Sequence, residues 1–450
     1  MKKFSSLFQA LQRVNTDTRL ITLVALAALA ATGAFAQSSV TITGGFDAGL
    51  RMSDIKGATV NQIVGNNSYT SNVTFKGTED LGGGLSANFQ YEIDPVATLT
   101  AGAPNGSPTS ADNSNVSNVG NGQSFVGLKS NSAGEIQFGT INTATLDANG
   151  MGQPFGTAIG SGYKIAAIAA TRYQQTFAYV TPSAAGFSGK LLYGFKDDKQ
   201  NNAAASGVSG TTGSMPLNGR DQIQELSLKY ANGPLNLIYV NLQTKSYATA
   251  GSLSSTACTA VQPTAVATTV APSAMTDGGA GNTCADGNAY KVNTFAGNYT
   301  MGALTGYGWY QTQKADGQTS ANPAALTSSA PLATVDRTAK GIAAKYQVSS
   351  PLSLQIGLRQ ITRNAGESYN ASVTGGNVAS AGIGQTTKVT ALGADYELSK
   401  RTAVYFRYES INDDAILSNT RGAGVGSGYT GADQGTGKIT NTAFGIRHTF

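Results

Sequence analysis

Charged residues are scarce in this chain of 450 residues, because Asp, Glu, Lys and Arg together make up only 12%. Ordinary soluble proteins carry about a quarter. Histidine occurs once, as His448, near the end of the sequence and on the outward parity of an alternating segment. A Ser-His-Asp site needs an imidazole within hydrogen-bond reach of a positioned serine. We therefore expect no catalytic residues, no enzyme activity, no metal site and no cofactor.

Long hydrophobic runs are also missing, except near the start. Residues 20–36 are almost wholly apolar, follow a basic leader and end in Ala34-Phe35-Ala36. This pattern is typical of a secretory signal peptide. We therefore expect residues 1–36 to be removed after Ala36 and residues 37–450 to form a single domain. The alternative is an uncleaved anchor, for which the apolar run is short.

The predicted leader also carries most of the positive charge. Residues 1–36 contain four basic residues and one acidic residue, so the formal net charge falls from +5 to +2 without them. A basic patch is the usual footprint of a nucleic-acid partner, and the rest of the chain offers little support for one. After residue 36 no apolar run reaches the ~18 residues of a transmembrane helix.

Glycine, tyrosine and phenylalanine are abundant, with 56, 19 and 16 residues. Several segments alternate strictly between apolar and polar residues: LSANFQYEID at 85–94, FSGKLLYGFK at 187–196 and TAVYFRYES at 402–410. A period of two predicts β-strands with one apolar and one polar face. The chain is therefore expected to be all-β.

The connections between these strands alternate in length. Seven short turns are expected at 80–85, 131–134, 181–186, 231–234, 299–302, 349–351 and 399–401. Eight long loops are expected near 53–68, 95–122, 142–171, 197–220, 244–289, 313–336, 362–386 and 411–437. Fifteen connections imply sixteen strands, and this layout is typical of an outer-membrane barrel with short periplasmic turns and long extracellular loops.

A closed barrel also satisfies the physics of a membrane, since every backbone N–H and C=O must be paired in hydrocarbon. We therefore predict a 16-stranded antiparallel transmembrane β-barrel, wide enough for an aqueous lumen. The alternative is a secreted soluble sandwich or repeat protein. It would need some sixteen amphipathic strands to share one core.

The sequence resembles the general, trimeric porins of Gram-negative bacteria, in particular the betaproteobacterial branch. The resemblance is carried by SSVTITGGFDAGL, FKGTEDLGGGLSANFQYE, SFVGLKSNSAGEIQFGT, RYQQTFAYVTPSAAGFSGKLLYG, YELSKRTAVYFRYE and AFGIRHTF. It implies a homotrimer in the outer membrane, in contact with lipid and lipopolysaccharide, that passes small polar solutes and ions by diffusion. It also implies that the third long loop, residues 142–171, folds into the barrel. Phe450 resembles the terminal signal that the outer-membrane assembly machinery recognises.

Two features depart from this family. Its members often carry Arg after the glycine that ends the fifth strand, whereas Thr140 follows Gly139 here. The constricting loop of many relatives carries several acidic residues, but this one offers only Asp147, with Lys164 as its one base. The electric field across the constriction is therefore expected to be weaker than in relatives.

The alternation also predicts which charges line the pore. The expected pore-lining residues are Lys76, Arg172, Lys190, Arg359, Arg407 and Asp147. Glu92, Asp94 and Glu409 are expected toward the long-loop ends, and Glu397 toward the short-turn side. Basic residues at mid-height predict a mild anion preference, because charged rings set ion selectivity in such pores. The alternative is that these are ordinary solvated charges with little net effect.

Cysteine occurs only twice, as Cys258 and Cys284, and both residues lie in one long loop. In an exported chain this pattern favours a disulfide over a pair of free thiols.

The predicted function is passive diffusion through a general porin. Two alternatives remain: a substrate-selective channel for small anionic compounds, and a surface adhesin or receptor barrel whose loops bind a partner.

Overall fold

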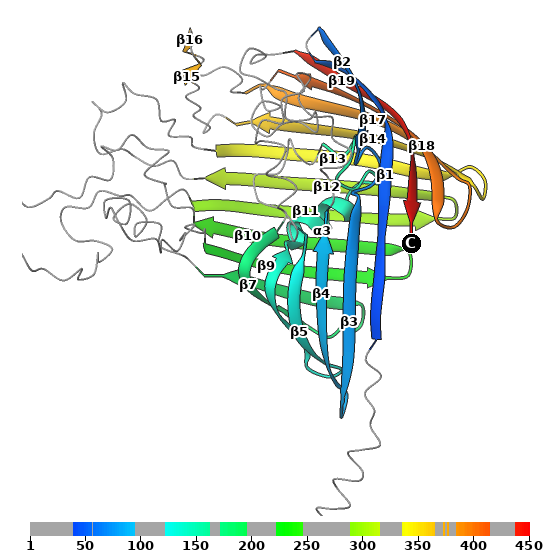
Figure 1. Ribbon diagram of the computed structural model, residues 1–450. Coiled ribbons are helices and arrows are strands. Elements are labelled where there is room, and N and C mark those ends of the chain that lie inside the picture. The colour runs from blue at the N-terminus through cyan, green and yellow to red at the C-terminus, as the bar shows by residue number, and fades with distance from the viewer. Residues whose placement is uncertain are drawn as a thin grey trace, which may run out of the picture.

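The computed structural model describes residues 39–55, 57–94, 122–162, 172–195, 222–245, 289–315, 335–364, 372–373, 376–377, 384–414 and 437–450. Almost all of these residues belong to one antiparallel sheet that curls into a barrel (Figure 1). Its strands are β1 (Ser39–Ile55), β2 (Ala58–Gly65), β3 (Asn72–Gly82), β4 (Leu85–Ile93), β5 (Ser124–Ser130), β6 (Gly134–Asn142), β7 (Arg172–Val180), β8 (Phe187–Gly194), β9 (Gln222–Asn232), β10 (Leu235–Lys245), β11 (Ala289–Met301), β12 (Leu304–Ala315), β13 (Val335–Gln347), β14 (Leu352–Arg363), β17 (Thr386–Glu397), β18 (Thr402–Asp413) and β19 (Lys438–Thr449). A separate two-stranded ribbon joins β15 (Ser372–Val373) to β16 (Gly376–Asn377).

The barrel closes through β1. One edge of this strand pairs with β19, from Gly45 opposite Thr449 to Ile55 opposite Ile439. Its other edge pairs with β2 along its second half and with β3 along its first half. Strands β2 and β3 are therefore two halves of one barrel strand, interrupted at residues 66–71. Counting them as one gives sixteen strands, which confirms the predicted closed, antiparallel, 16-stranded barrel.

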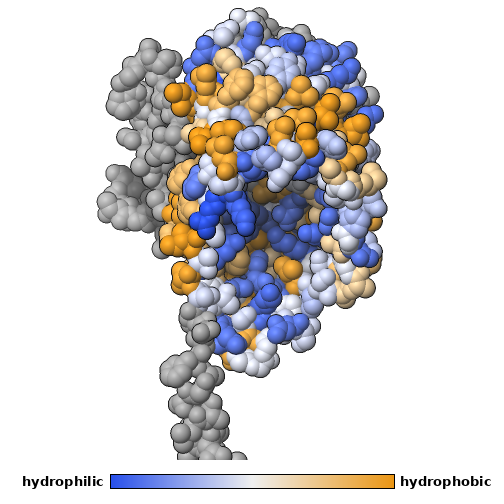
Figure 2. Space-filling view, turned by 90° about the vertical axis from the view of Figure 1, so that its right-hand side faces the viewer, coloured by the Kyte–Doolittle hydropathy of each residue, from blue (hydrophilic) through white to orange (hydrophobic). Residues whose placement is uncertain are grey.

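The two faces of the sheet differ in polarity, as the alternation predicts. In β14 the side chains of Leu354, Ile356 and Leu358 point outward and are 46–47% exposed, whereas Gln355 and Arg359 point inward and are 6–7% exposed. The face shown in Figure 2 is hollowed. Hydrophilic residues predominate in the hollow, and hydrophobic residues gather on the outer surface above it and along its left side. The chain thus forms an apolar cylinder with a polar interior.

All seven predicted short turns are present, because each falls between two consecutive paired strands. In the β3–β4 turn, Gly82, Gly83 and Gly84 all have φ between +63° and +83°. Side chains with a Cβ rarely adopt this left-handed region, so glycine is required there. The first predicted long loop, 53–68, is wrong: β1 continues to Ile55, and β2 occupies Ala58–Gly65 after a tight turn.

The described part of the chain contains one helix, α3 (Ala144–Met151), which lies inside the barrel at the start of the third long loop. Ala144 and Ala148 on α3 are buried in an apolar cluster with the inward-facing residues Ile238, Ala296 and Trp309. The third loop therefore folds into the lumen after β6, as predicted, and packs against the β10–β12 wall. Within the described residues, no helix is long and apolar enough to cross a membrane.

Candidate functional site

A buried carboxylate fixes the first turn of α3. Glu225, which points inward from β9 and is 1% exposed, accepts hydrogen bonds from the Ala144 and Thr145 backbone N–H groups at 2.5 and 3.1 Å. The Thr145 hydroxyl donates to it at 3.0 Å. Thr143 caps the helix by accepting from Leu146 N at 3.3 Å. A negative charge is favourable at a helix N-terminus, where N–H groups lack partners within the helix, so Glu225 anchors α3 to the wall.

The C-terminal end of α3 is held by close packing. A Cβ at position 152 would lie 2.9 Å from both Cβ and Cδ1 of Trp309, so only glycine fits without a shift of the ring. Asn298 Nδ2 on β11 also donates to the Met151 carbonyl at 3.0 Å. Both ends of the helix are thus attached to the β9–β12 wall.

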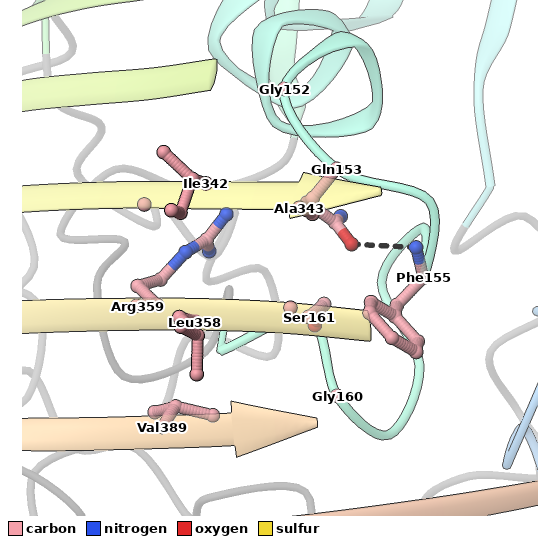
Figure 3. A pocket seen from close by; sticks show the side chains of 12 residues that line it. Gly152, Gln153, Phe155, Gly160, Ser161, Ile342, Ala343, Leu358, Arg359 and Val389 are labelled. Carbon is pink, nitrogen blue, oxygen red and sulfur yellow. Dashed lines mark hydrogen bonds between the residues drawn. The ribbon is translucent and has the colours of Figure 1, made fainter. Parts of the chain in front are cut away.

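Arg359, a predicted pore-lining residue, lies beneath the third loop (Figure 3). Its guanidinium carbon is 4.1 Å from the centroid of the Trp309 ring, and Nη1 donates to Asn149 Oδ1 at 3.3 Å. The residue is only 7% exposed. A small pocket beside it is lined in part by Gln153, whose Oε1 accepts from Phe155 N at 2.6 Å. Arg359 therefore supports the loop more than it faces the open lumen.

The loop reaches the opposite wall at its tip, residues 155–161. Gly160 N donates to Glu409 Oε2 at 2.8 Å, and Asn441 Nδ2 donates to Glu409 Oε1 at 3.1 Å. Ile159 is buried in a small cluster with Tyr405 and with an alanine of β19. The third loop consequently spans the lumen from β9–β12 to β18–β19, and Glu409, expected toward the long-loop end, is its anchor on the far side.

Arg407, another predicted pore-lining residue, points inward but is 2% exposed. Its Nη2 lies 2.9 and 3.1 Å from the two carboxylate oxygens of Asp395 on the neighbouring strand. Arg447 joins the same group, with salt bridges of 3.2 Å to Asp395 and 2.8 Å to Glu397. The charge of Arg407 is therefore largely compensated.

The remaining predicted bases lie on the β3–β9 side of the barrel. Arg172 pairs with Asp94 at 3.1 Å, and Lys190 Nζ donates to the Asn142 carbonyl at 2.6 Å. Lys76 is exposed and takes part in none of the salt bridges of the described residues. The same holds for Lys129 on β5 and Lys229 on β9, which sequence reasoning did not select although both have inward parity.

Asp147 is exposed to the lumen on the first turn of α3. Enclosure by the surrounding barrel raises the pKa of its carboxyl above the usual range, and the charges of Lys190 and Lys229 partly offset this effect. The structure thus places Asp147 near Lys190 and Lys229, whereas Arg359 and Arg407 lie on the other wall.

Phe450 follows the last strand and is fixed to β1. Phe450 N donates to the Gly44 carbonyl at 3.0 Å, Gly44 N donates to the Phe450 carbonyl at 3.2 Å, and the Phe450 and Phe46 ring centroids are 6.0 Å apart. Cys258, Cys284, Lys164 and residues 1–36 lie outside the described residues. Among the described residues, no group of three or more His, Cys, Asp or Glu side chains could hold a metal ion.

Residues 22–366 match the model of the Gram-negative porin family. An outer membrane porin protein of Bordetella pertussis is 30% identical over 259 residues, which cover 52% of this chain and 63% of the relative. Outer membrane porin protein 32 of Delftia acidovorans is 31% identical over 48% of this chain and 57% of its own length. The matches thus span less than two thirds of these curated relatives.

Solved structures match over more of the chain. An anion-selective porin from Comamonas acidovorans superposes with a TM-score of 0.60 at 20% identity, covering 92% of this chain and 100% of that one. OmpT, an outer membrane protein of Vibrio cholerae, superposes with a TM-score of 0.53 at 16% identity and covers 92% and 98%. These structures share their overall fold with this chain.

Proposed function

The chain belongs to the Gram-negative porin family, and on this premise we propose that it forms a water-filled channel of the outer membrane through which small hydrophilic solutes and ions diffuse passively. The observation that carries the proposal is a closed barrel, apolar outside and polar inside, whose lumen is crossed by residues 142–162. An apolar outer face suits lipid, and a polar inner face suits water. We accordingly place the protein among channels and not among enzymes.

The described charges support a mild anion preference. Arg407 is compensated by Asp395, and Arg359 is covered by the third loop. On the β3–β9 wall the accessible positive charge is carried by lysines, and the charges of Lys190 and Lys229 act on Asp147, the single acidic residue of α3. Charged side chains that line a pore set its ion selectivity, so this half of the passage would favour anions.

The lysine wall also bears on the narrower alternative of a selective channel for small anionic compounds. The Comamonas acidovorans neighbour is titled an anion-selective porin, which describes that protein. In this chain the lysines are spread over four strands, β3, β5, β8 and β9, and only Lys190 and Lys229 both act on Asp147. A dispersed charge fits a preference among ions better than a binding site for one compound.

The test is reconstitution of the purified protein in a planar bilayer, with the reversal potential recorded across a potassium chloride gradient. Open-channel steps with a reversal potential that favours chloride are expected. Steps that favour potassium would retain the channel and overturn the anion preference. A folded barrel without steps would overturn the channel and would favour the surface adhesin or receptor barrel. Saturable block by one anionic solute would favour the selective channel.

Further proposals rest on family membership and on the sequence. We infer a homotrimer in contact with outer-membrane lipid and lipopolysaccharide, and export by a signal peptide of residues 1–36 that leaves Gln37 first. We infer that Phe450 is read by the outer-membrane assembly machinery, and that Cys258 and Cys284 form a disulfide. Chemical cross-linking, N-terminal sequencing and thiol titration of the purified protein test these points separately.

A further inference from the structure

Residues 66–71 leave the barrel wall at mid-height and enter the lumen. They separate β2 from β3 at the middle of β1, between the pairs Gly65–Ala48 and Asn72–Gly45. The segment begins at Asn66 with a φ of 59°, in the left-handed region that few residues other than glycine adopt. Where a strand in a membrane loses its inter-strand hydrogen bonds, its backbone N–H and C=O groups must find other partners. The partners of these groups therefore reveal what holds the segment.

The main partner is Asp47, an inward-facing residue of β1 that is 0% exposed. Its carboxylate accepts three consecutive backbone N–H groups, those of Asn67 at 3.3 Å, Ser68 at 2.7 Å and Tyr69 at 2.8 Å. The Tyr405 hydroxyl donates to the same carboxylate at 2.6 Å from β18. The buried carboxylate of Asp47 thus accepts the backbone N–H groups that no longer bond to a neighbouring strand.

The segment is also closed on itself. Asn66 Oδ1 accepts from Ser71 N at 2.7 Å, and the Ser71 hydroxyl oxygen accepts from Asp47 N at 3.0 Å. Asn67 Nδ2 donates to the Val64 carbonyl at 3.0 Å. With both ends tied, the segment forms a compact knob that is built into the wall.

The knob contacts the tip of the third loop. Ile159 N donates to the Asn67 carbonyl at 3.2 Å, and the hydroxyl oxygens of Thr70 and Thr157 are 2.8 Å apart. On its other side Ser68 Oγ accepts from Arg407 Nη2 at 2.8 Å. The two inward segments, 66–71 and 155–161, therefore support one another in front of the β18–β19 wall.

We propose that residues 66–71 are a second constriction segment, held in the lumen by Asp47 as a positioning residue, and that together with the tip of the third loop they set the size limit of the channel. The proposal rests on the channel function inferred above. It assigns the narrowing of the pore to two segments that are locked to each other, so that loosening either one widens the passage.

The first test is Asp47→Asn. An amide offers one acceptor oxygen in place of two, so part of the four hydrogen bonds is lost and the segment is released from the wall. The expected result is a higher unit conductance and entry of larger polyethylene glycols in a polymer-exclusion experiment. Asp54→Asn is the matched control, because Asp54 lies on the same strand, is exposed and bonds only Gly57 N among the described residues. It should behave as the wild type.

If the wild type conducts and the folded D47N barrel has the same conductance and polymer cut-off, this inference alone is overturned. Absence of current in the wild type would overturn the proposed function as well. Folding is checked by the shift in gel mobility on heating. If D47N does not fold, Tyr405→Phe is used instead, since it removes a single hydrogen bond to Asp47 and keeps the charge of the carboxylate. Its conductance and polymer cut-off are then compared with those of the wild type in the same way.

The second test is a cross-link between the two segments. Thr70→Cys and Thr157→Cys are combined in a C258S/C284S background, where the hydroxyl contact of 2.8 Å brings the new thiols together. Oxidation of the folded barrel should link them and leave the conductance at its wild-type value. Failure to link, or a large fall in conductance on linking, would show that the two segments are not joined in the open channel.

Discussion

The attachment of α3 by Glu225 leads to a quantitative prediction. In Glu225→Gln the carboxylate becomes a neutral amide, although its size and its position on β9 are kept. Hydrogen bonds to a charged group contribute about 1.5–3 kcal/mol, against about 1 kcal/mol for neutral ones. The favourable interaction with the helix N-terminus, about 0.3–1 kcal/mol, is lost as well. Together these effects should lower the free energy of local opening at α3 by about 2 kcal/mol.

Hydrogen exchange at the amides of Ala144 and Thr145 measures this local opening directly. Since each 1.4 kcal/mol corresponds to a factor of about ten, a loss of about 2 kcal/mol should accelerate exchange about 30-fold in E225Q. Glu225→Ala leaves three buried donors without their acceptor, and its effect should be larger. In bilayers both variants should show noisier open-channel current, because the loop moves more freely.

The matched control is Glu135→Gln. Glu135 also faces the lumen, but within the described residues its carboxylate accepts from Asn88 Nδ2 at 3.0 Å and Gln137 Nε2 at 2.6 Å, away from α3. Exchange at the α3 amides should be unchanged in E135Q. Equal acceleration in both variants, or none in E225A, would refute the reasoning that Glu225 holds the loop.

Three further predictions concern other parts of the chain. Arg359→Ala removes a cation–π contact worth about 0.5–2 kcal/mol from Trp309, the single tryptophan, so acrylamide should quench its fluorescence more strongly. As pH falls through the raised pKa of Asp147, protonation removes a negative charge from the lumen; chloride preference should therefore rise on acidification, and Asp147→Asn should remove this change. Thiol titration of the denatured protein should find no free cysteine before reduction and two after it, through Cys258 and Cys284.

The sequence was sufficient for the barrel because the alternating signal is repeated in most strands. In β2 the alternation fails, because inward residues there are covered by other protein. In β2, Val60 and Val64 point inward, and Val64 is 3% exposed. These apolar inward residues remove the contrast between faces, so the segment resembles a loop in sequence although it pairs along its whole length with β1.

The charges of the lumen could be predicted only in part. Parity places Arg407 on the inner face correctly, but its partner Asp395 lies on another strand, two residues beyond the one directly opposite. Such diagonal contacts depend on strand register, which one sequence does not reveal. The same limit applies to Glu225 and Asp47, because both act on segments that are distant in sequence. A carboxylate within a strand gives no local sign that it will bind backbone N–H groups.

The double role of β1 has a consequence for the order in which the barrel can assemble. Half of this strand binds β3, which follows it closely in the chain, whereas the other edge binds β19, about 400 residues away. Contacts of such high sequence separation are slow to form, because the chain loses the entropy of loop closure before any stabilising contact is made. The β1–β19 seam is therefore expected to be the last to close. Until it closes, β1 presents an unpaired edge that a second chain could occupy, so the seam is also where misassembly of two chains would begin.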